Sequence, residues 1–589
     1  MTWQAWYTLA VTLVALWLLA RETYAPANIM LGAVIALLLG RVITPAEAFA
    51  GFGNSAPITV AALYILARGV ERTGLMLPLL HAVLGRGQGR GSLARLTASS
   101  AAASAFLNNT PLVAMLISPV TDWAERTGQS PSRFLMPLSY AVILGGVVTL
   151  IGTSTNLVVS GLLDAKTGRP MGLFEITPLG LPVALVGVVV LVLTAPRLLP
   201  ERRPARRDLG ENLREFTVSM DVVRGGPLDG KTVEEAGLRN LQGVFLAELE
   251  RQGEQVAPVA STTVLRGGDR LLFVGRVDTI VDLQAIRGLV SSEDRHLAAF
   301  GSAGHTFFEA VIGATSPLLG KTLKQAQFRS RYQAAVLAIH RAGHRLNAKL
   351  GEVELKVGDT LLVLADPAFR TRWRDRNDFL LVSELGGAPP AISRKAWLVG
   401  LVMLAVVVAA GAGLLPMLEC ALVAAVALVG FGVLTASEAR NAVDLDVVLM
   451  VAASFGLGSA MENSGLADRV AAAIIRTFEP FGPLGVLLGI VLATSLVTEI
   501  VTNNAAAALV FPIAFATALK TGQDPRLYAL VVAVMASTSF LTPIGYQTNT
   551  MVYGPGGYRF TDYTRLGAPL TLVVMAVILV VARFWYGIA

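Results

Sequence analysis

Long apolar segments occupy both ends of this 589-residue chain, and a more polar stretch separates them. The first apolar part ends near Leu199 and the second begins near Trp397. Apolar segments of about 20 residues are long enough to cross a lipid bilayer as helices. Between the two parts, charges recur every few residues, and short apolar runs such as 271–274 and 361–364 predict β-strands. The pattern therefore predicts two membrane halves with a soluble module between them.

Each half is expected to cross the membrane about five times and to contain one hairpin that enters the membrane without crossing it. Each hairpin carries a pair of asparagines near its middle, where its helix should break. An odd number of crossings places the halves in opposite orientations, as in transporters built from inverted repeats. We thus expect an α-helical polytopic membrane protein with inverted repeats, two re-entrant hairpins and an inserted α+β cytoplasmic module. The expected segments are 3–19, 28–42, 58–70, the hairpin 93–120, 134–163 and 179–198 in the first half, and 397–415, 418–434, 447–461, the hairpin 484–518, 528–553 and 566–584 in the second.

Composition agrees with this class and gives the orientation. Hydrophobic residues make up 54% of the chain and charged residues only 15%, with a mean hydropathy of +0.61. Because lysine and arginine gather in cytoplasmic loops of membrane proteins, the net charge of +7 does not predict a nucleic-acid partner. Basic residues in 86–95, 202–207 and 394–395 fall on the side of the soluble module. This side is therefore predicted to be cytoplasmic, with both termini outward, in a bacterial inner membrane.

The residue types that carry most enzyme chemistry are scattered or missing. The chain has a single cysteine, Cys420, and its five histidines lie without the spacing of metal ligands. No nucleophile, paired carboxylate or cluster of metal ligands falls near the asparagine pairs. We therefore expect neither an enzyme nor a covalently bound cofactor.

Two polar clusters interrupt the apolar segments at matching positions. The first comprises Asn-Asn-Thr at 108–110 and Gly-Thr-Ser-Thr-Asn at 152–156, and the second comprises Thr-Asn-Asn at 502–504 and Gly-Tyr-Gln-Thr-Asn at 545–549. Uncharged polar groups at membrane depth are tolerated where they line a cavity or meet irregular backbone. Two matching clusters predict one binding site between two repeats. Positive helix ends suit an anion there, whereas carbonyl, amide and hydroxyl oxygens suit sodium.

A second repeated pair supports a duplicated chain. Segments 71–75 and 462–466 both place a glycine two residues after a polar pair, and they lie 391 residues apart (462 − 71). Pairing Asn108 with Asn503 gives a shift of 395 (503 − 108). Gly74 and Gly465 predict helix ends, where glycine readily adopts the left-handed conformation.

One carboxylate lies close to the asparagines. Glu499 comes four residues before Asn503. We interpret Glu499 as a solvated residue of the hairpin, and a coupling group is the alternative.

These motifs resemble those of the divalent anion:sodium symporter family, part of the ion transporter superfamily. The hallmark of that family is a Ser-Asn-Thr triplet at each of two opposed hairpin tips, followed by a loop that ends in asparagine on the next span. The resemblance implies two sodium sites, one formed by Asn109 with Gly152 and the other by Asn503 with Gly545. It also implies that the anion is bound by residues of both clusters, namely Asn108, Thr110, Thr155, Asn156, Thr502, Asn504, Thr548 and Asn549.

The chain departs from the family pattern in both clusters. Neither triplet is Ser-Asn-Thr, and the Pro-Pro-Asn ends of the family's loops are replaced by Ser-Thr-Asn at 154–156 and Gln-Thr-Asn at 547–549. The substrate therefore remains open between sulfate and a dicarboxylate, and the more polar loops suit a compact oxyanion.

The module between the halves contains a repeat of its own. Pro-Leu-x-Gly-Lys-Thr occurs at 227–232 and 317–322, and Gly-Asp occurs at 268–269 and 358–359, each with a shift of ninety residues (317 − 227). The Gly-Lys-Thr triplets lack the leading glycine of a phosphate-binding loop, and Gly-Asp before an apolar strand predicts a turn. The pair resembles TrkA-C (RCK C-terminal) domains of potassium transport regulators. That resemblance implies regulation, a homodimer and an unidentified small ligand.

The expected organisation is a membrane repeat at 1–199, TrkA-C-like domains at 207–290 and 295–380, and a second membrane repeat at 394–589. The function predicted from these observations is sodium-coupled symport of a small divalent anion by alternating access. Its partners would be the anion, sodium and the bilayer. One alternative is a cation transporter or sodium/proton antiporter regulated by the TrkA-C-like domains, but an acidic residue would then be expected at the hairpin tips. The other is an anion sensor that does not transport.

Overall fold

The computed structural model of the chain describes residues 2–21, 24–75, 90–201, 216–238, 244–251, 254–256, 259–260, 262–275, 286, 288–291, 306–313, 316–341, 344–346, 350–366, 368–373, 378–379, 381–384, 393–543 and 545–588. The predicted domain boundaries at 207, 295 and 380 lie outside these residues. The chain divides into two compact units, 203–305 and the remainder, and each is described here by itself.

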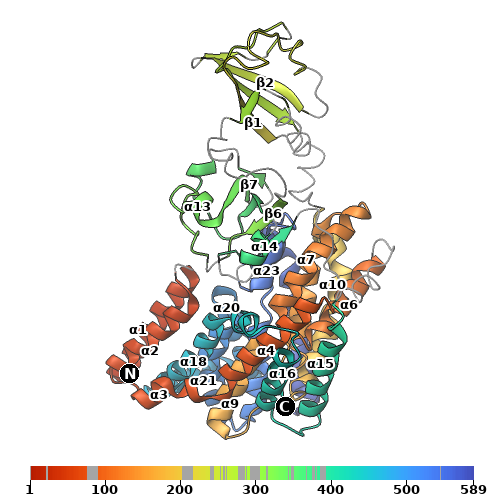
Figure 1. The fold of residues 1–589 in the computed structure, drawn as a ribbon. Helices are drawn as coiled ribbons and strands as arrows, with labels where there is room; N and C mark the ends of the chain where they lie inside the picture. The colour runs from red at the N-terminus through yellow and green to blue at the C-terminus, as the bar shows by residue number, and fades with distance from the viewer. Residues whose placement is uncertain are drawn as a thin grey trace. The chain divides into compact units, whose positions relative to one another are not determined.

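The helices of the larger unit follow the same order in both halves. Each half begins with helices that match the expected first three spans, continues with two helices around an asparagine pair, and ends with a broken span and one long helix (Figure 1). The first half contains α1 (Trp3–Arg21), α2 (Pro26–Leu39), α3 (Pro45–Phe49), α4 (Ser55–Thr73), α6 (Arg90–Ser104), α7 (Asn109–Arg126), α8 (Leu135–Gly146), α9 (Ser154–Thr167) and α10 (Thr177–Leu198). The second contains α15 (Ala396–Gly411), α16 (Met417–Gly430), α17 (Ala436–Ala442), α18 (Leu445–Asn463), α19 (Leu466–Phe478), α20 (Gly482–Ile500), α21 (Asn503–Thr521), α22 (Pro525–Ser537), α23 (Gln547–Tyr553) and α24 (Phe560–Phe584).

Local chemistry repeats along with the helix order. The short helices α3 and α17 both begin with a capping box, in which Thr44 bonds with Glu47 and Thr435 bonds with Glu438. Gly74 ends α4 in the left-handed conformation, and Gly465 adopts the same conformation between α18 and α19, so both predicted helix ends are confirmed. The sequence analysis did not predict the short capped helices or the amphipathic α19 as separate elements.

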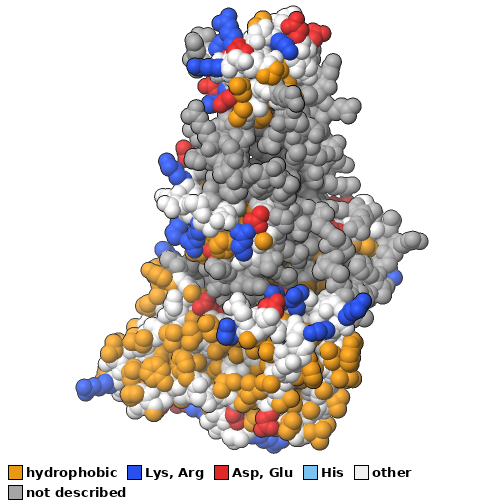
Figure 2. All heavy atoms as spheres, in the orientation of Figure 1, with side chains coloured by type: hydrophobic (Ala, Val, Ile, Leu, Met, Phe, Trp, Pro, Cys, Tyr) orange, Lys and Arg blue, Asp and Glu red, His pale blue; other side chains and the backbone are white. Residues whose placement is uncertain are grey.

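The exposed surface of the helices is apolar. Seven helical segments within the described residues are long and apolar enough to cross a membrane. Side chains such as Leu39, Val426 and Leu572 are mostly exposed. Figure 2 shows hydrophobic side chains covering much of the visible face of the helical part, with charged groups gathered toward its edges. Large exposed apolar surfaces of this kind suit lipid rather than water, as expected for a polytopic membrane protein.

The tightest packing brings the polar segments of the two halves together. Helix α6 packs against α8, α21 packs against α22, and α9 of the first half contacts both α21 and α22 of the second. Outside this region α4 packs along α16, and α10 packs along α24 (Figure 1). The broken helices are thus enclosed by neighbours, while α1, α15 and α16 keep long exposed faces.

Two five-stranded antiparallel sheets are formed by the segment between the halves. The first has the strand order β3-β2-β4-β1-β5, and the second has β8-β7-β9-β6-β10, so their topologies are identical. Each interrupts its central pairing at the same place, at 246–248 and at 336–338. The strands are β1 (Phe216–Val222), β2 (Val244–Arg251), β3 (Glu254–Val256), β4 (Arg270–Gly275), β5 (Leu289–Ser291), β6 (Thr306–Val311), β7 (Ala334–Arg341), β8 (His344–Arg345), β9 (Thr360–Ala365) and β10 (Leu381–Glu384).

The Gly-Asp turns hold a buried ion pair in both sheets. Gly268 has a positive φ of 97°, and the next residue, Asp269, is 2% exposed and accepts two bonds from Arg251 at 2.7 and 2.6 Å. Its carboxylate also accepts the backbone N–H of Arg266. The hydrogen bond with Asp269 raises the pKa of the Arg251 guanidinium above its ordinary value. Asp359 and Arg341 repeat this arrangement in the second sheet.

We expect Asp269→Ala to destabilise the first sheet by about 3–5 kcal/mol, because it leaves the partner guanidinium and a backbone N–H without their acceptor. The matched control is Asp221→Ala, which removes an ion pair whose side chains are 40% and 50% exposed and should cost about 1 kcal/mol or less. Unfolding in urea, monitored by limited proteolysis at sites within 216–291, measures the free energy of unfolding of both variants. Equal effects of the two substitutions would contradict the structural role of the buried pair.

Candidate functional site

The asparagine pairs lie at breaks between two consecutive helices. Helix α6 ends at Ser104 and α7 begins at Asn109, while α20 ends at Ile500 and α21 begins at Asn503. The helices thus break at the asparagines, as the sequence predicts. Both Asn109 and Asn503 occupy the first position of their helix and are buried, with 0% and 7% exposed. The first backbone N–H groups of α7 and α21 therefore lie beside these side chains, without an intrahelical partner.

Hydrogen bonds at the two tips are equivalent, and they fix the register of the repeat. Ser104 Oγ bonds with Asn109 at 2.6 Å and with the carbonyl of residue 142 at 2.7 Å. Thr498 Oγ1 likewise bonds with Asn503 at 3.3 Å and with the carbonyl of residue 536 at 2.6 Å. Asn109 therefore corresponds to Asn503, a shift of 394 (503 − 109). The pairing of Asn108 with Asn503, expected from the sequence, is wrong by one residue.

The loops that follow are held by their own last asparagines. Asn156 Nδ2 donates to the carbonyls of residues 146 and 149 at 3.1 and 2.9 Å. Asn549 Nδ2 donates to the carbonyls of residues 539 and 542 at 3.0 and 3.3 Å. Each loop therefore forms the same two hydrogen bonds within its own half. Both asparagines are completely buried. Their amides close the breaks in the two spans instead of facing an open surface.

Each tip reaches the loop of the opposite half. Asn504 Oδ1, from α21, accepts hydrogen bonds from Ser154 at 3.2 Å and from Thr155 at 2.9 Å, both at the start of α9. Thr110 Oγ1, from α7, bonds with Gln547 at 3.2 Å, at the start of α23. The predicted site residues of the two halves are therefore brought together by crossed contacts.

The predicted anion-binding residues differ in their access to solvent. Thr155 and Thr548 are 1% and 0% exposed, and Thr548 bonds with Ser139 at 3.0 Å. Thr502, Asn108 and Thr110 are half-buried, as is Ser154, while Gln547 is exposed. The accessible polar surface between the halves therefore includes two residues that sequence reasoning did not assign, Ser154 and Gln547. Their positions in the two loop motifs were the available signal.

The predicted sodium positions are surrounded by oxygen atoms. A Cβ atom added to Gly152 would lie 2.5 Å from the carbonyl oxygen of Gly146 and 2.7 Å from that of Ser104. A Cβ atom added to Gly545 would lie 2.1 Å from Ser539 Oγ and 3.1 Å from Thr542 Oγ1. Only glycine fits such close approaches. Carbonyl and hydroxyl oxygens are the ligands of hard cations, and no group of three histidine, cysteine or acidic residues that could hold another metal occurs in the part of the chain that the structure describes.

Tyr546 of the second half takes part in the first of these positions. Its hydroxyl lies 2.7 Å from the side-chain amide of Asn109 and 3.1 Å from Thr153 Oγ1. Thr153 and Tyr546 are equivalent residues of the two loops, 393 positions apart. The sequence motif contained Tyr546, but only the tertiary structure shows that its side chain crosses to the other half.

Glu499 is half-buried, but its carboxylate bonds with the protein and not with solvent, so its interpretation as a solvated residue is wrong. One carboxylate oxygen accepts the backbone N–H groups of Phe540 at 2.8 Å and Leu541 at 3.0 Å. The other is buried without a hydrogen-bond partner among the described residues. At a shift of 394, the equivalent of Glu499 in the first half is Ala105. Of these two equivalent positions, only that of the second half therefore has a carboxyl group beside it.

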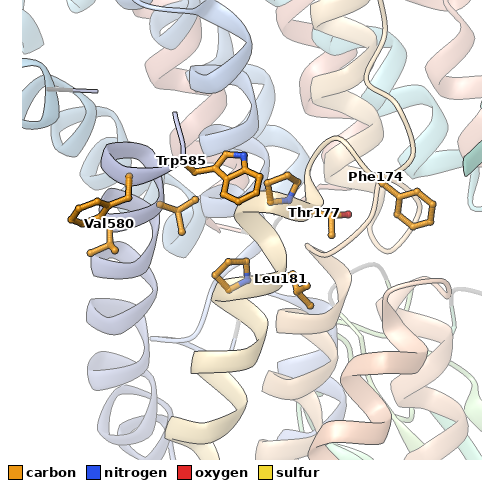
Figure 3. A pocket seen from close by; sticks show the side chains of 9 residues that line it. Phe174, Thr177, Leu181, Val580 and Trp585 are labelled. Carbon is orange, nitrogen blue, oxygen red and sulfur yellow. The ribbon is translucent and has the colours of Figure 1, made fainter. Parts of the chain in front are cut away.

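An apolar groove on the outer surface has different chemistry. The groove, about 570 Å³ in volume, lies between α10 and α24 and is lined by Phe174, Leu181, Val580 and Trp585, among others (Figure 3). Its only hydroxyl on a lining side chain belongs to Thr177, which donates to the carbonyl of residue 148 at 2.7 Å. Apart from the indole N–H of Trp585, the lining side chains offer no further donor, so the groove suits a lipid chain better than a polar substrate.

A model of the citrate transporter family matches residues 14–535 and 421–588 of the chain. This chain belongs to the citrate transporter family. Membership makes the protein a multi-pass membrane transporter and not an enzyme, which agrees with the transporter class predicted from the polar clusters.

Relatives from other organisms extend along almost the whole chain. The protein is 38% identical to a putative sulfur deprivation response regulator of Chlamydomonas reinhardtii, over 91% of this chain and 94% of that one. It is 35% identical to an uncharacterized transporter of Synechocystis sp., over 100% of this chain and 98% of that one. It is also 25% identical to sodium/sulfate cotransporter 1 of Chlamydomonas reinhardtii, over 100% of this chain and 91% of that one.

Two substitutions test the structural role of Glu499 in this transporter. Glu499→Ala should lower stability by about 1–3 kcal/mol, because two buried N–H groups lose their acceptor. Glu499→Gln keeps one acceptor oxygen and should remain close to the wild type. Thermal unfolding of the detergent-solubilised protein measures both. A glutamine variant as unstable as the alanine variant would show that the charge, and not the bonds to Phe540 and Leu541, stabilises the loop.

Proposed function

We propose that this protein is a sodium-coupled symporter that moves a small divalent anion across a bacterial inner membrane by alternating access. The observation that carries the proposal is the pair of equivalent tips at Asn109 and Asn503, each in contact with the loop of the opposite half. Polar groups inside a membrane transporter are costly unless they bind the transported species or one another. The helices around the tips act as two re-entrant hairpins in inverted repeats.

Sodium binds beside the two buried asparagines. The first site takes Asn109 with the Gly152 loop, and the second takes Asn503 with the Gly545 loop. Support comes from the close oxygen atoms around both glycines and from the burial of both asparagines. Two sodium ions offset the charge of a divalent anion, which is otherwise met only by neutral groups, since neither motif contains lysine, arginine or histidine.

The anion binds on the accessible polar surface between the sodium sites. Asn108, Thr110 and Thr502 supply this surface from the tips, and Ser154 and Gln547 supply it from the loops. Hydroxyl and amide groups around a compact space favour sulfate, and three relatives are named as sodium/sulfate cotransporters. The name of the family points to citrate, so succinate and citrate are the substrates to compare with sulfate.

The two sheets act as cytoplasmic TrkA-C-like domains that regulate transport or join two copies in a homodimer. The predicted ranges 207–290 and 295–380 cover all of their strands except the last residue of β5 and the whole of β10. Their identical topology and repeated ion pair support a duplicated domain. An unidentified small molecule is the expected ligand.

Uptake by proteoliposomes tests the proposed function. Labelled sulfate should accumulate when an inward sodium gradient is imposed and should not when potassium replaces sodium, and the same vesicles compare succinate and citrate. Sodium-independent accumulation would exclude the coupling, and binding without uptake would identify a sensor.

Asn109→Ala and Asn503→Ala should each raise the sodium concentration needed for half-maximal uptake by about tenfold or more, because each removes one oxygen ligand from a cation site. Folding should change little. The control is Asn463→Ala at the end of α18, which loses bonds to residues 42 and 47 outside the site and should transport normally. Normal transport by both site variants would mean that Asn109 and Asn503 only hold neighbouring helices together and do not bind sodium.

Glu499 supports a second candidate function, sodium/proton exchange, because a buried carboxylate stands next to the second tip. This candidate predicts that a sodium gradient alone changes the internal pH of proteoliposomes without any added anion. The symport hypothesis predicts no such change.

A further inference from the structure

We propose that Tyr546 couples the two ligands, by making a hydroxyl hydrogen available to the anion only after sodium has bound at Asn109. The inference rests on the proposed function, because it assumes a cation beside Asn109 and an anion between the halves. It adds a residue from the second half to the sodium site of the first.

The amide of Asn109 is surrounded by acceptors on one side and by Tyr546 on the other. In the orientation that satisfies all neighbours, Nδ2 lies 3.2 Å from the carbonyl oxygen of Gly152, 3.1 Å from that of Val142 and 2.6 Å from the Ser104 hydroxyl, and its two hydrogens can bond with two of these three acceptors. Oδ1 then accepts the Tyr546 hydroxyl at 2.7 Å. The amide nitrogen thus lies among acceptor oxygen atoms, two of them carbonyl oxygens of the kind that bind a cation, so this orientation suits the sodium-free site.

Sodium requires the opposite orientation. A cation between the two carbonyl oxygens needs Oδ1 of Asn109 to turn toward it, because an amide N–H repels a cation. The turned amide directs Nδ2 at the Tyr546 hydroxyl, across the same 2.7 Å. Without a cation this orientation places Oδ1 of Asn109 against the carbonyl oxygens of Gly152 and Val142, which is unfavourable. Sodium binding therefore reverses the hydrogen bond between Asn109 and Tyr546.

The reversal changes how many hydroxyl hydrogens are free. Without sodium, Tyr546 donates to Asn109 and Thr153 donates to Tyr546 across 3.1 Å, so both hydroxyl hydrogens are used. With sodium, Asn109 donates to Tyr546, and the bond between Tyr546 and Thr153 uses only one of their two hydrogens. The other becomes free. An anion gains from such a donor, because hydrogen bonds to charged acceptors are about twice as strong as neutral ones.

The free hydroxyl lies beside the accessible polar surface. Thr153 and Tyr546 directly precede Ser154 and Gln547, which are the half-buried and exposed residues of the two loops. We place the anion against the half-buried Tyr546, because Thr153 is only 1% exposed.

At the second sodium position, no hydroxyl from the opposite half bonds with the asparagine among the described residues. Asn503 bonds only with Thr498 and with the carbonyl of residue 537 in its own half, at 3.3 and 3.4 Å. The residue that corresponds to Tyr546 is Thr153, whose shorter side chain bonds with Tyr546 and, among the described residues, not with Asn503. Coupling through a shared hydroxyl is thus a property of the first site.

Tyr546→Phe tests the inference, with Tyr528→Phe as the control. Tyr528 is a buried tyrosine of α22 whose hydroxyl has no hydrogen-bond partner among the described residues, so its loss should be neutral. Binding of labelled sulfate and of succinate to the purified full-length protein is measured in saturating sodium and with choline in its place. A sodium titration and a thermal unfolding curve are recorded for each variant.

We expect Tyr546→Phe to weaken anion binding in saturating sodium by about ten- to a hundredfold, the loss of one charged hydrogen bond. Half-saturation by sodium should shift by less than about threefold, because Tyr546 bonds with Asn109 in both orientations and the two losses offset each other. The anion affinity measured in choline should not change. The ratio of anion affinity in sodium to that in choline should therefore fall by the same factor as the affinity in sodium. Thr153→Val leaves the Tyr546 hydrogen free once Asn109 has turned, so this variant should keep both the anion affinity and its enhancement by sodium.

Wild-type anion affinity and wild-type enhancement by sodium in Tyr546→Phe would overturn the inference and leave the proposed symport intact. A large shift in sodium affinity with unchanged anion affinity would also overturn it, since Tyr546 would then belong to the cation alone. If Tyr546→Phe unfolds at a lower temperature than Tyr528→Phe, the two media decide the question: a loss of anion affinity in sodium alone supports the inference, and an equal loss in sodium and in choline overturns it. Absence of any sodium effect on anion binding in the wild type would instead contradict the proposed function.

Discussion

Broken helices inside an apolar environment require that every freed backbone group finds a partner within the protein. The arrangement of the transport region depends on this constraint. Asn156 and Asn549 close the breaks in the two spans with pairs of bonds to loop carbonyls. Ser104 and Thr498 tie the two tips to the neighbouring helices α8 and α22. Because these bonds hold the backbone, the remaining amides and hydroxyls are available to face ligands.

The two halves share a scaffold but differ in chemistry. The bonds that hold the tips and loops are equivalent at a nearly constant shift, whereas the residues around them have diverged. Glu499 replaces the alanine found at position 105, and Tyr546 replaces Thr153. A carboxyl group stands beside one position, and a crossing hydroxyl reaches the other. The repeated bonds therefore give both halves the same geometry, and the residues that differ make the two tips chemically unequal.

The two sheets follow the same principle with a different outcome. Their strand order, their central interruption and their buried Arg-Asp pair are all repeated. Here the repeated polar contact lies within each sheet and ties a turn to a neighbouring strand. It stabilises each fold separately and leaves no charged pair aimed at a ligand.

Hydropathy and spacing alone determined much of the architecture. Apolar length gives the helical segments, and repeated motifs give the broken helices, the position of both asparagine pairs and the duplicated sheets, because these follow from local patterns and from burial. The sequence could not decide which asparagines pair, since Asn108 and Asn109 are neighbours of the same type and only the bonds of Ser104 distinguish them. It also could not show that the Glu499 carboxylate bonds with the protein or that Tyr546 reaches Asn109, because those contacts join residues 41 to 437 positions apart. Contacts of that kind depend on how helices from the two halves pack, and packing is decided only when the whole chain has folded.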